Sequence, residues 1–219
     1  MARVAFFDLD KTVISIHSGR SWIRSEYRQG HMSLLDVSKA LFGLGKYTLG
    51  MSSVETMIRA AIRDHVGVRE QDIIERTQAF YKRDVRSTVR PGAHRVLDEH
   101  REQGHLCVLL TASTNYLADL VGPALRFHDV ICTRLEVDNE GIFTGQPVEP
   151  LCFGTGKVAA AQAWSNQTGV GLHDAFFYTD SYTDLPMLEA VGYPVLVHPD
   201  VRLRKLGERR SWPIQYWDN

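Results

Sequence analysis

The sequence has few cysteines, and their arrangement builds no covalent or zinc-bound framework. The 219 residues include 3 cysteines, an odd number, at Cys107, Cys132 and Cys152. These positions form no Cys-x-x-Cys pair and no cysteine and histidine cluster with zinc-binding spacing. The pattern excludes a disulfide-stapled secreted domain and a zinc finger. It predicts buried thiols in a reducing compartment.

Long apolar runs are also missing. The first apolar stretch, residues 4–7, is interrupted by Asp8, which makes it too short for the hydrophobic region of a signal peptide. No run approaches the roughly 18 apolar residues that a membrane-spanning helix needs. We therefore expect a cytoplasmic protein with no stable membrane insertion.

An excess of charge of either sign is the third absence. Lysine and arginine total 25 against 26 acidic residues, which leaves a net charge of -1, and the basic residues are scattered. Nucleic-acid-binding proteins usually gather basic residues on one face, so no nucleic-acid partner is predicted. With 44% hydrophobic and 23% charged residues, the chain resembles an ordinary globular protein of one large domain, or of one domain with an insertion.

The sequence does contain an alternation of short apolar runs and helical patterns. The apolar runs lack the polar alternation of half-exposed strands, which is typical of strands buried in a parallel sheet. The alternation of strands and helices along the chain predicts an α/β fold with a doubly wound, mostly parallel, Rossmann-like sheet. The expected strands are residues 4–9, 106–110, 130–133, 175–178 and 194–197, and the expected helices are 92–103, 115–121, 157–168 and 184–191.

One long segment breaks this alternation. Residues 15–88 show helical periodicity, as in "MSSVETMIRAAI" and "EQDIIERTQAFYKRDV", without a convincing strand. We predict a core domain made of residues 1–14 and 89–219, with residues 15–88 inserted after the first strand as a helical cap. Within the core, turn residues at 138–141 flanked by apolar positions predict a small β-hairpin over 137–150.

Polar residues capable of chemistry cluster at the ends of the predicted strands. In an open parallel sheet, ligands bind beyond the carboxyl ends of the strands, near the point where strand order reverses. Four carboxylates meeting there need a cation, and hard oxygen ligands suit Mg²⁺ together with a phosphate. A metal and a lysine can screen a phosphate so that a carboxylate attacks phosphorus. The residues concerned are Asp8, Asp10, Thr111, Lys157, Asp180 and Asp184.

These residues stand in four motifs that resemble a known family. "DLDKT" at 8–12, the apolar run ending in Thr111, Lys157, and "DSYTD" at 180–184 are similar to the ordered motifs of the haloacid-dehalogenase-like superfamily. The resemblance is closer to its phosphoserine-phosphatase-like branch, in which a helical cap falls between the first and second motifs. It covers nearly the whole chain. It implies a phosphatase that hydrolyses a small-molecule phosphate ester with the help of Mg²⁺.

The resemblance also implies a role for each motif residue. Asp8 would be the nucleophile, and Asp10 would protonate the leaving oxygen and later activate water. The phosphoryl oxygens would be held by Thr111, Ala112 and Lys157. The magnesium ligands would be the Asp8 carboxylate, the Asp10 backbone carbonyl and Asp180, with Asp184 positioning a ligand or a water behind them.

The sequence departs from this branch at the residue that recognises the substrate. Phosphoserine phosphatases carry a glutamate in the cap-entry stretch that binds the substrate's amino group. His17 stands at the aligned position here, and Glu26 is the next acidic residue. The resemblance therefore implies the chemistry and leaves the physiological ester, the pathway and the oligomeric state open. The apolar, glycine-punctuated stretch 34–51 is expected to pack within the cap or, alternatively, to contact lipid.

The motifs are also compatible with other interpretations. A phosphotransferase would pass the same aspartyl-phosphate to an acceptor other than water, and a non-catalytic binding protein could share the fold. "DKT" at 10–12 also occurs in ion-pumping ATPases, but those continue with Gly-Thr, whereas Val13 and Ile14 follow here. "GTGK" at 154–157 is not a P-loop, because Leu151 and Val158 replace the required glycine and hydroxyl residue.

Overall fold

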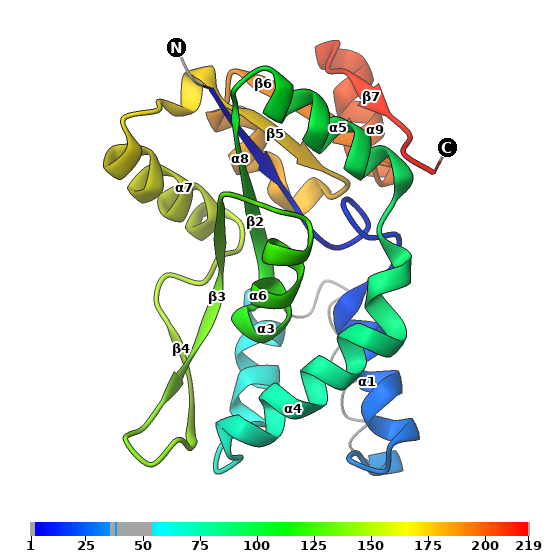
Figure 1. Cartoon of the computed structure of the whole chain (residues 1–219), viewed down its shortest axis with the longest axis vertical. Coiled ribbons are helices and arrows are strands. Elements are labelled where there is room, and N and C mark those ends of the chain that lie inside the picture. Colours follow the sequence, from blue (N-terminus) through cyan, green and yellow to red (C-terminus); the bar gives the residue numbers. More distant parts are fainter. Residues whose placement is uncertain (1–2, 36–37, 39–53, 219) are drawn as a thin grey trace.

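The computed structural model describes residues 3–35, 38 and 54–218, and a seven-stranded sheet lies at its centre (Figure 1). The strand order is β4-β3-β2-β1-β5-β6-β7, and every pairing is parallel except that of β3 with β4. The strands are β1 (Val4–Phe7), β2 (Leu106–Thr114), β3 (Asp129–Val137), β4 (Phe143–Val148), β5 (Phe176–Thr179), β6 (Tyr193–Val197) and β7 (Ile214–Gln215).

Helices cover both faces of the sheet, which confirms the predicted doubly wound α/β class. In β1, Ala5 and Phe7 pack into one apolar cluster with α5 and α6, while Val4 and Phe6 pack into a second cluster with α7, α8 and α9. A strand buried on both faces is apolar at every position, which explains the uninterrupted run. The helices are α1 (Ser18–Arg28), α3 (Val54–Arg63), α4 (Glu70–Phe80), α5 (Pro91–Glu102), α6 (Asn115–Ala124), α7 (Thr155–Thr168), α8 (Leu185–Ala190) and α9 (Val201–Arg210).

All five predicted strands are present, with differences at their ends. The hairpin expected over 137–150 is formed by β3 and β4, which pair antiparallel. The prediction that Thr111 ends its strand is wrong, because β2 continues to Thr114 after a shift of register beyond Leu110. Helix α9 and strand β7 were not predicted. The two-residue β7 is too short to show a pattern in the sequence.

Residues 15–88 contain α1, α3 and α4, as expected of a helical insertion (Figure 1). The two connections of this insertion to the sheet run side by side and are hydrogen-bonded to each other. The amide of Ser15 donates to the Thr88 carbonyl at 2.8 Å, and the amide of Arg90 donates to the Val13 carbonyl at 2.9 Å. This ladder lies at the predicted boundaries 14/15 and 88/89, although the division into two domains remains a prediction.

The insertion is also attached to the hairpin of the sheet. The backbone amide of Gly67 donates to the Phe143 carbonyl at 3.1 Å, and the Phe143 amide donates to Val68 at 3.0 Å. An apolar cluster that includes Ile62, Ile73 and Phe143 fills the contact. The helical segment is thus held to the sheet at two places. Most of stretch 34–51 lies outside the described residues, so neither expectation for it is tested.

None of the helices in the described part of the chain combines the length and the apolar character that crossing a membrane requires.

A buried pair of histidines lies beside β1 and β5, where His100 contacts Phe7 and Tyr178. His100 of α5 is 5% exposed, and its Nδ1 lies 2.8 Å from Nδ1 of His105. Its Nε2 lies 2.8 Å from the hydroxyl of Tyr178 in β5. Burial, followed by the neighbouring His105, lowers the pKa of His100 to about 4. The ring is therefore neutral in the folded protein near neutral pH.

This depressed pKa predicts that His100 makes a destabilising contribution on mild acidification, which the difference between the wild type and a His100 variant separates from the other titrating groups. Between the unfolded pKa of 6.5 and the folded pKa of about 4, the unfolded chain binds the proton more readily, so stability falls as pH falls. We expect His100 to contribute a decrease of about 2 kcal/mol in the free energy of unfolding from about pH 7 to about pH 5. Urea denaturation of the wild type and of His100→Gln at both values measures it.

The exposed His173→Gln is the matched control for this prediction, and it should keep the wild-type pH dependence. An identical pH slope in the wild type and in His100→Gln would contradict the assignment.

Candidate active site

Asp8 lies where the order of the strands reverses. It follows β1, whose neighbours are β2 on one side and β5 on the other, and its backbone amide donates to the Tyr178 carbonyl at 2.9 Å. The sheet therefore continues its pairing up to the residue that carries the carboxylate. A switch point of this kind is the usual ligand-binding position in doubly wound sheets.

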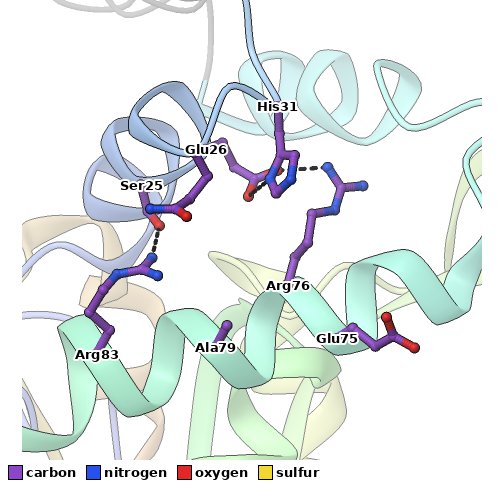
Figure 2. A pocket seen from close by; sticks show the side chains of 8 residues that line it. Ser25, Glu26, His31, Glu75, Arg76, Ala79 and Arg83 are labelled. Atoms are coloured by element: carbon purple, nitrogen blue, oxygen red, sulfur yellow. Dashed lines mark hydrogen bonds and ion pairs between the residues drawn. The ribbon is translucent and has the colours of Figure 1, made fainter.

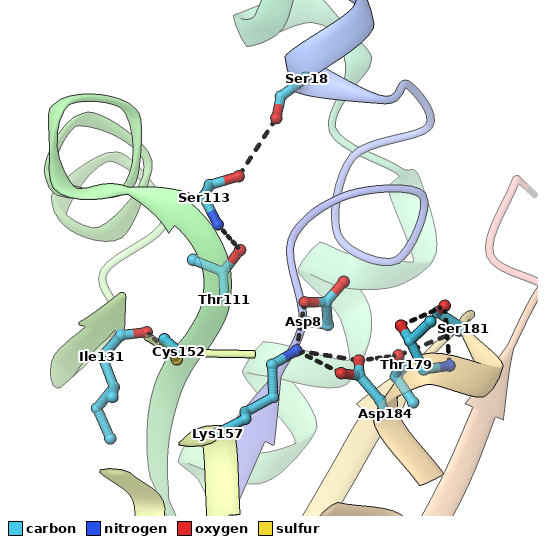
Figure 3. A network of polar contacts seen from close by, with 11 residues as sticks. Asp8, Ser18, Thr111, Ser113, Ile131, Cys152, Lys157, Thr179, Ser181 and Asp184 are labelled. Atoms are coloured by element: carbon cyan, nitrogen blue, oxygen red, sulfur yellow. Dashed lines mark hydrogen bonds and ion pairs between the residues drawn. The ribbon is translucent and has the colours of Figure 1, made fainter. Parts of the chain in front are cut away.

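Lys157 joins two buried carboxylates at this point (Figure 3). Its Nζ lies 2.9 Å from Oδ1 of Asp8 and 2.9 Å from Oδ1 of Asp184, and the lysine is 1% exposed. Thr179, the last residue of β5, donates its hydroxyl to Asp184 at 2.7 Å. Helix α7 begins at Thr155, so the lysine projects from its first turn towards the ends of β1 and β5.

Burial and the neighbouring charges shift the pKa of each ionisable group in this network. Burial lowers the pKa of Lys157, but the charges of Asp184 and Asp8 outweigh burial, so the net shift is upward and the ammonium stays charged. Burial raises the pKa of Asp8 to about 7, against the lowering effect of Lys157. Burial and then the charge of Asp8 raise the pKa of Asp180 to about 8. When ionised, the carboxylates of Asp8, Asp180 and Asp184 carry more negative charge than the one lysine neutralises.

A cation suits this excess of negative charge, which supports the predicted magnesium site. In the described residues, no three side chains of histidine, cysteine, aspartate or glutamate form a group that could hold a metal. The predicted ligands are the carboxylates of Asp8 and Asp180 and the backbone carbonyl of Asp10. That set fits Mg²⁺, because this ion commonly takes one or two carboxylates and keeps several waters.

Asp10 is held by the start of the helical insertion. Its Oδ2 accepts a hydrogen bond from the backbone amide of Ser18, the first residue of α1, at 3.1 Å. Nδ1 of His17 lies 3.1 Å from the same oxygen. The other oxygen, Oδ1, is buried and accepts no hydrogen bond from any described residue. One carboxylate oxygen is thus fixed by the start of the insertion, and the other has no partner among the described residues.

Two of the three predicted phosphate-binding residues, Thr111 and Ala112, lie on the extended end of β2. Thr111 is 1% exposed, and its hydroxyl oxygen accepts the amide of Ser113 at 3.1 Å. The hydroxyl of Ser113 lies 3.3 Å from that of Ser18, which joins this strand to α1 (Figure 3). Ala112 lies between Thr111 and Ser113 in β2. The phosphate-binding roles of Thr111, Ala112 and Lys157 remain predictions.

Glu26, the first acidic residue after His17 in the sequence, is already paired. It is 5% exposed and lies 2.8 Å from Nη1 of Arg76 and 3.2 Å from Nδ1 of His31. Figure 2 shows these groups meeting between α1 and α4, beside a cavity of about 190 Å³. Both oxygens of the Glu26 carboxylate therefore already have partners within the insertion.

Sequence reasoning missed two residues that shape the site. Thr179 precedes Asp180 at the end of a predicted strand, so the strand-end argument could have identified it. The amide of Ser18 could not be found in this way, because a backbone donor at a helix start has no signature in the residue type. Its contact with Asp10 depends on where the insertion returns to the sheet.

A family model for haloacid dehalogenase-like hydrolases matches residues 5–189 of the chain. The chain belongs to this hydrolase family. The matched region begins in β1 and ends in α8, so it includes Asp8, Lys157 and Asp184 with the whole insertion.

Individual relatives extend the likeness along the chain. The phosphoserine phosphatase SerB1 of Mycobacterium tuberculosis is 29% identical in an alignment of 223 positions that covers 98% of this chain and 71% of the relative. The histidinol-phosphatase of Neisseria meningitidis is 24% identical and matches 98% of both chains. The crystal structure of a protein of unknown function from Bordetella pertussis superposes with a TM-score of 0.90, at 25% identity and with 98% of both chains covered. The predicted enzyme class, a phosphatase of the haloacid dehalogenase-like type, is confirmed.

Removing the central ammonium should damage both activity and stability. In Lys157→Met, the buried carboxylates of Asp8 and Asp184 lose their shared counter-ion. Breaking a buried ion pair on one side typically costs about 3 kcal/mol or more. We expect that loss in the free energy of unfolding near neutral pH, together with at least a hundredfold (~10²) decrease in turnover of p-nitrophenyl phosphate.

Lys205→Met, an exposed change on α9, is the control and should leave both quantities unchanged. Wild-type stability and turnover in Lys157→Met would show that the ammonium does not support the site.

Proposed function

We propose that this protein is a Mg²⁺-dependent phosphomonoesterase that hydrolyses a small phosphate ester through an aspartyl-phosphate on Asp8. The observation that carries the proposal is the buried bridge from Lys157 to Asp8 and Asp184 at the switch point of the sheet. A nucleophilic carboxylate needs its charge screened before it can approach a phosphate dianion. The ammonium of Lys157 lies where it provides that screening.

The proposed first step transfers the phosphoryl group to the protein. An oxygen of the Asp8 carboxylate forms a bond to phosphorus, and the bond between phosphorus and the ester oxygen breaks. Asp10 donates a proton to the departing oxygen, so the alcohol leaves neutral. The free Oδ1 of Asp10 is the oxygen that can carry this proton, because Oδ2 is held by Ser18 and faces His17.

The proposed second step returns the protein to its starting state. Asp10, now ionised, accepts a proton from a water that attacks phosphorus, and the bond between Asp8 and phosphorus breaks. Inorganic phosphate leaves, and the Asp8 carboxylate and the protonated Asp10 are restored. Thr111 and Ala112 are proposed to bind phosphoryl oxygens through a hydroxyl and a backbone amide.

Magnesium is proposed to bind the Asp8 carboxylate, the Asp10 carbonyl and Asp180, with Asp184 supporting them. When bound, the ion supplies charge neutralisation to the phosphoryl oxygens. Asp184 keeps its own position through Lys157 and Thr179, so it can orient a water or a ligand without moving.

The paired state of Glu26 argues against phosphoserine as the substrate, as far as the described residues of the insertion go. An ammonium group on the substrate needs a free carboxylate, and Glu26 is engaged by Arg76 and His31. His17 stands where the resemblance places the substrate-binding glutamate, and it lies against Asp10. We therefore propose that the ester is one whose alcohol carries no ammonium group at that position.

We also propose a reducing compartment, because all three cysteines are free thiols.

Asp8→Asn should abolish turnover, because an amide cannot act as the anionic nucleophile. The measurement is phosphate release with magnesium from a panel of phosphoserine, other amino-alcohol phosphates, sugar phosphates, nucleotides and lysophospholipids. We expect one class to be preferred by the wild type and no release by Asp8→Asn. Asp174→Asn, a change at a half-exposed aspartate just before β5, should behave as the wild type.

Full activity of Asp8→Asn would overturn the assignment of the nucleophile. Silence of the wild type on every ester would instead favour a phosphotransferase or a binding protein, and adding alcohols as acceptors separates these two.

Asp180→Asn should act chiefly on magnesium. Replacing one of two carboxylate ligands with an amide is expected to raise the magnesium concentration for half-maximal activity by about tenfold or more. Calorimetry with magnesium alone measures the same loss without substrate, and Asp174→Asn is again the control. An unchanged magnesium affinity by both methods would remove Asp180 from the proposed ligand set.

A further inference from the structure

The C-terminal segment 214–218 folds back onto the start of α5 (Figure 1). Trp217 is fully buried, and its carbonyl accepts the backbone amide of Gly92 at 2.9 Å. A side chain at Gly92 has no room, because its Cβ would lie 2.7 Å from the Cα of Trp217. The amide of Trp217 donates to Nε2 of His198 at 2.7 Å. The segment is therefore tightly seated rather than loosely attached.

Arg90, the residue before α5, joins this segment to the active-site loop. It is 7% exposed, its Nη1 donates to the carboxylate of Asp218, and its Nη2 donates to the backbone carbonyl of Lys11 at 3.3 Å. Its backbone amide bonds Val13, within the ladder at the base of the insertion. A buried guanidinium requires a counter-ion, and Asp218 supplies it.

The carbonyl that Arg90 holds belongs to a strained turn. Lys11 has a φ of 57°, a left-handed conformation that is unfavourable for a side chain larger than glycine. The surrounding structure must supply the free energy that maintains it. Lys11 follows Asp10 directly, so the conformation of this turn determines where the Asp10 carboxylate points. The bond from Arg90 is one of the contacts that hold it.

We propose that Arg90 is a positioning residue for the acid/base carboxylate of Asp10, and that Asp218 keeps Arg90 in place. The proposal rests on the proposed function, because it assumes that Asp10 protonates the leaving oxygen. The chain of contacts runs from Asp218 through Arg90 to the Lys11 carbonyl, and from there along the backbone to Asp10. Every contact in it is between groups far apart in the sequence.

The test uses the dependence of the reaction on its leaving group. An alkyl phosphate needs its leaving oxygen protonated, whereas p-nitrophenyl phosphate releases a stable anion and needs little help. A misplaced Asp10 should therefore lower kcat/KM for the alkyl ester more than for p-nitrophenyl phosphate. A variant that merely lowers the amount of folded enzyme would lower both equally. The ratio of the two values is the readout, measured with the fastest alkyl ester of the panel.

We expect the ratio to fall about tenfold in Arg90→Gln and by about threefold or more in Asp218→Asn. Arg90→Lys should recover part of the loss. The double variant should be no worse than Arg90→Gln, because both changes interrupt one path. Asp10→Asn sets the lower limit of the ratio. Arg95→Gln, a change at an exposed arginine of α5, should match the wild type. If Arg90→Gln does not fold, Asp218→Asn decides alone, since its side chain is 60% exposed.

An unchanged ratio in Asp218→Asn and Arg90→Gln, or an equal loss on both substrates, would overturn the proposal. If Asp8→Asn is inactive and the ratio is nevertheless unchanged, only this inference fails. If Asp8→Asn keeps its turnover, the proposed function fails and the inference fails with it.

Discussion

The site depends on one buried ammonium between two carboxylates. Lys157 is nearly inaccessible to water, and so are Asp8 and Asp184, which it bridges. Without the lysine, the two acids at the centre of the sheet would repel each other in a medium that screens charge poorly. The same ammonium fixes the direction of both carboxylates. Electrostatic neutralisation and geometric positioning are therefore supplied by one side chain from the first turn of α7.

A second constraint connects the sheet to the helical insertion. Asp10 bonds the first amide of α1, and the hydroxyls of Ser18 and Ser113 lie close together. The insertion is additionally attached through its two paired connections and through the β3–β4 hairpin. Any movement of α1 must change the surroundings of Asp10, whereas Asp8 is held from the opposite side by Lys157. The positions of the two candidate catalytic carboxylates are therefore held by different parts of the structure: that of Asp10 by α1, and that of Asp8 by Lys157.

Substrate recognition has a different physical basis from the chemistry. The acids and the lysine converge because parallel strands end at one edge of the sheet, and this holds for any member of the family with the same motifs. We propose that the group that recognises the alcohol comes from the insertion, where the carboxylate of an acidic residue can instead be paired with a neighbouring arginine. Glu26 illustrates this, since its carboxylate is neutralised by Arg76. A count of acidic residues near the first motif therefore does not reveal the ester.

The sequence by itself determined the fold class, the positions of the main strands along the chain and most of the polar residues that follow them. These features follow from local patterns, namely uninterrupted apolar runs and the residues that terminate them, as in Val4 to Asp8. The tertiary structure decided which groups meet. The Ser18 amide on Asp10, the pairing of Glu26 with Arg76, and the route from Asp218 through Arg90 to Lys11 join positions between 8 and 128 residues apart. Such contacts depend on how separate elements pack in space, and no local pattern encodes that packing.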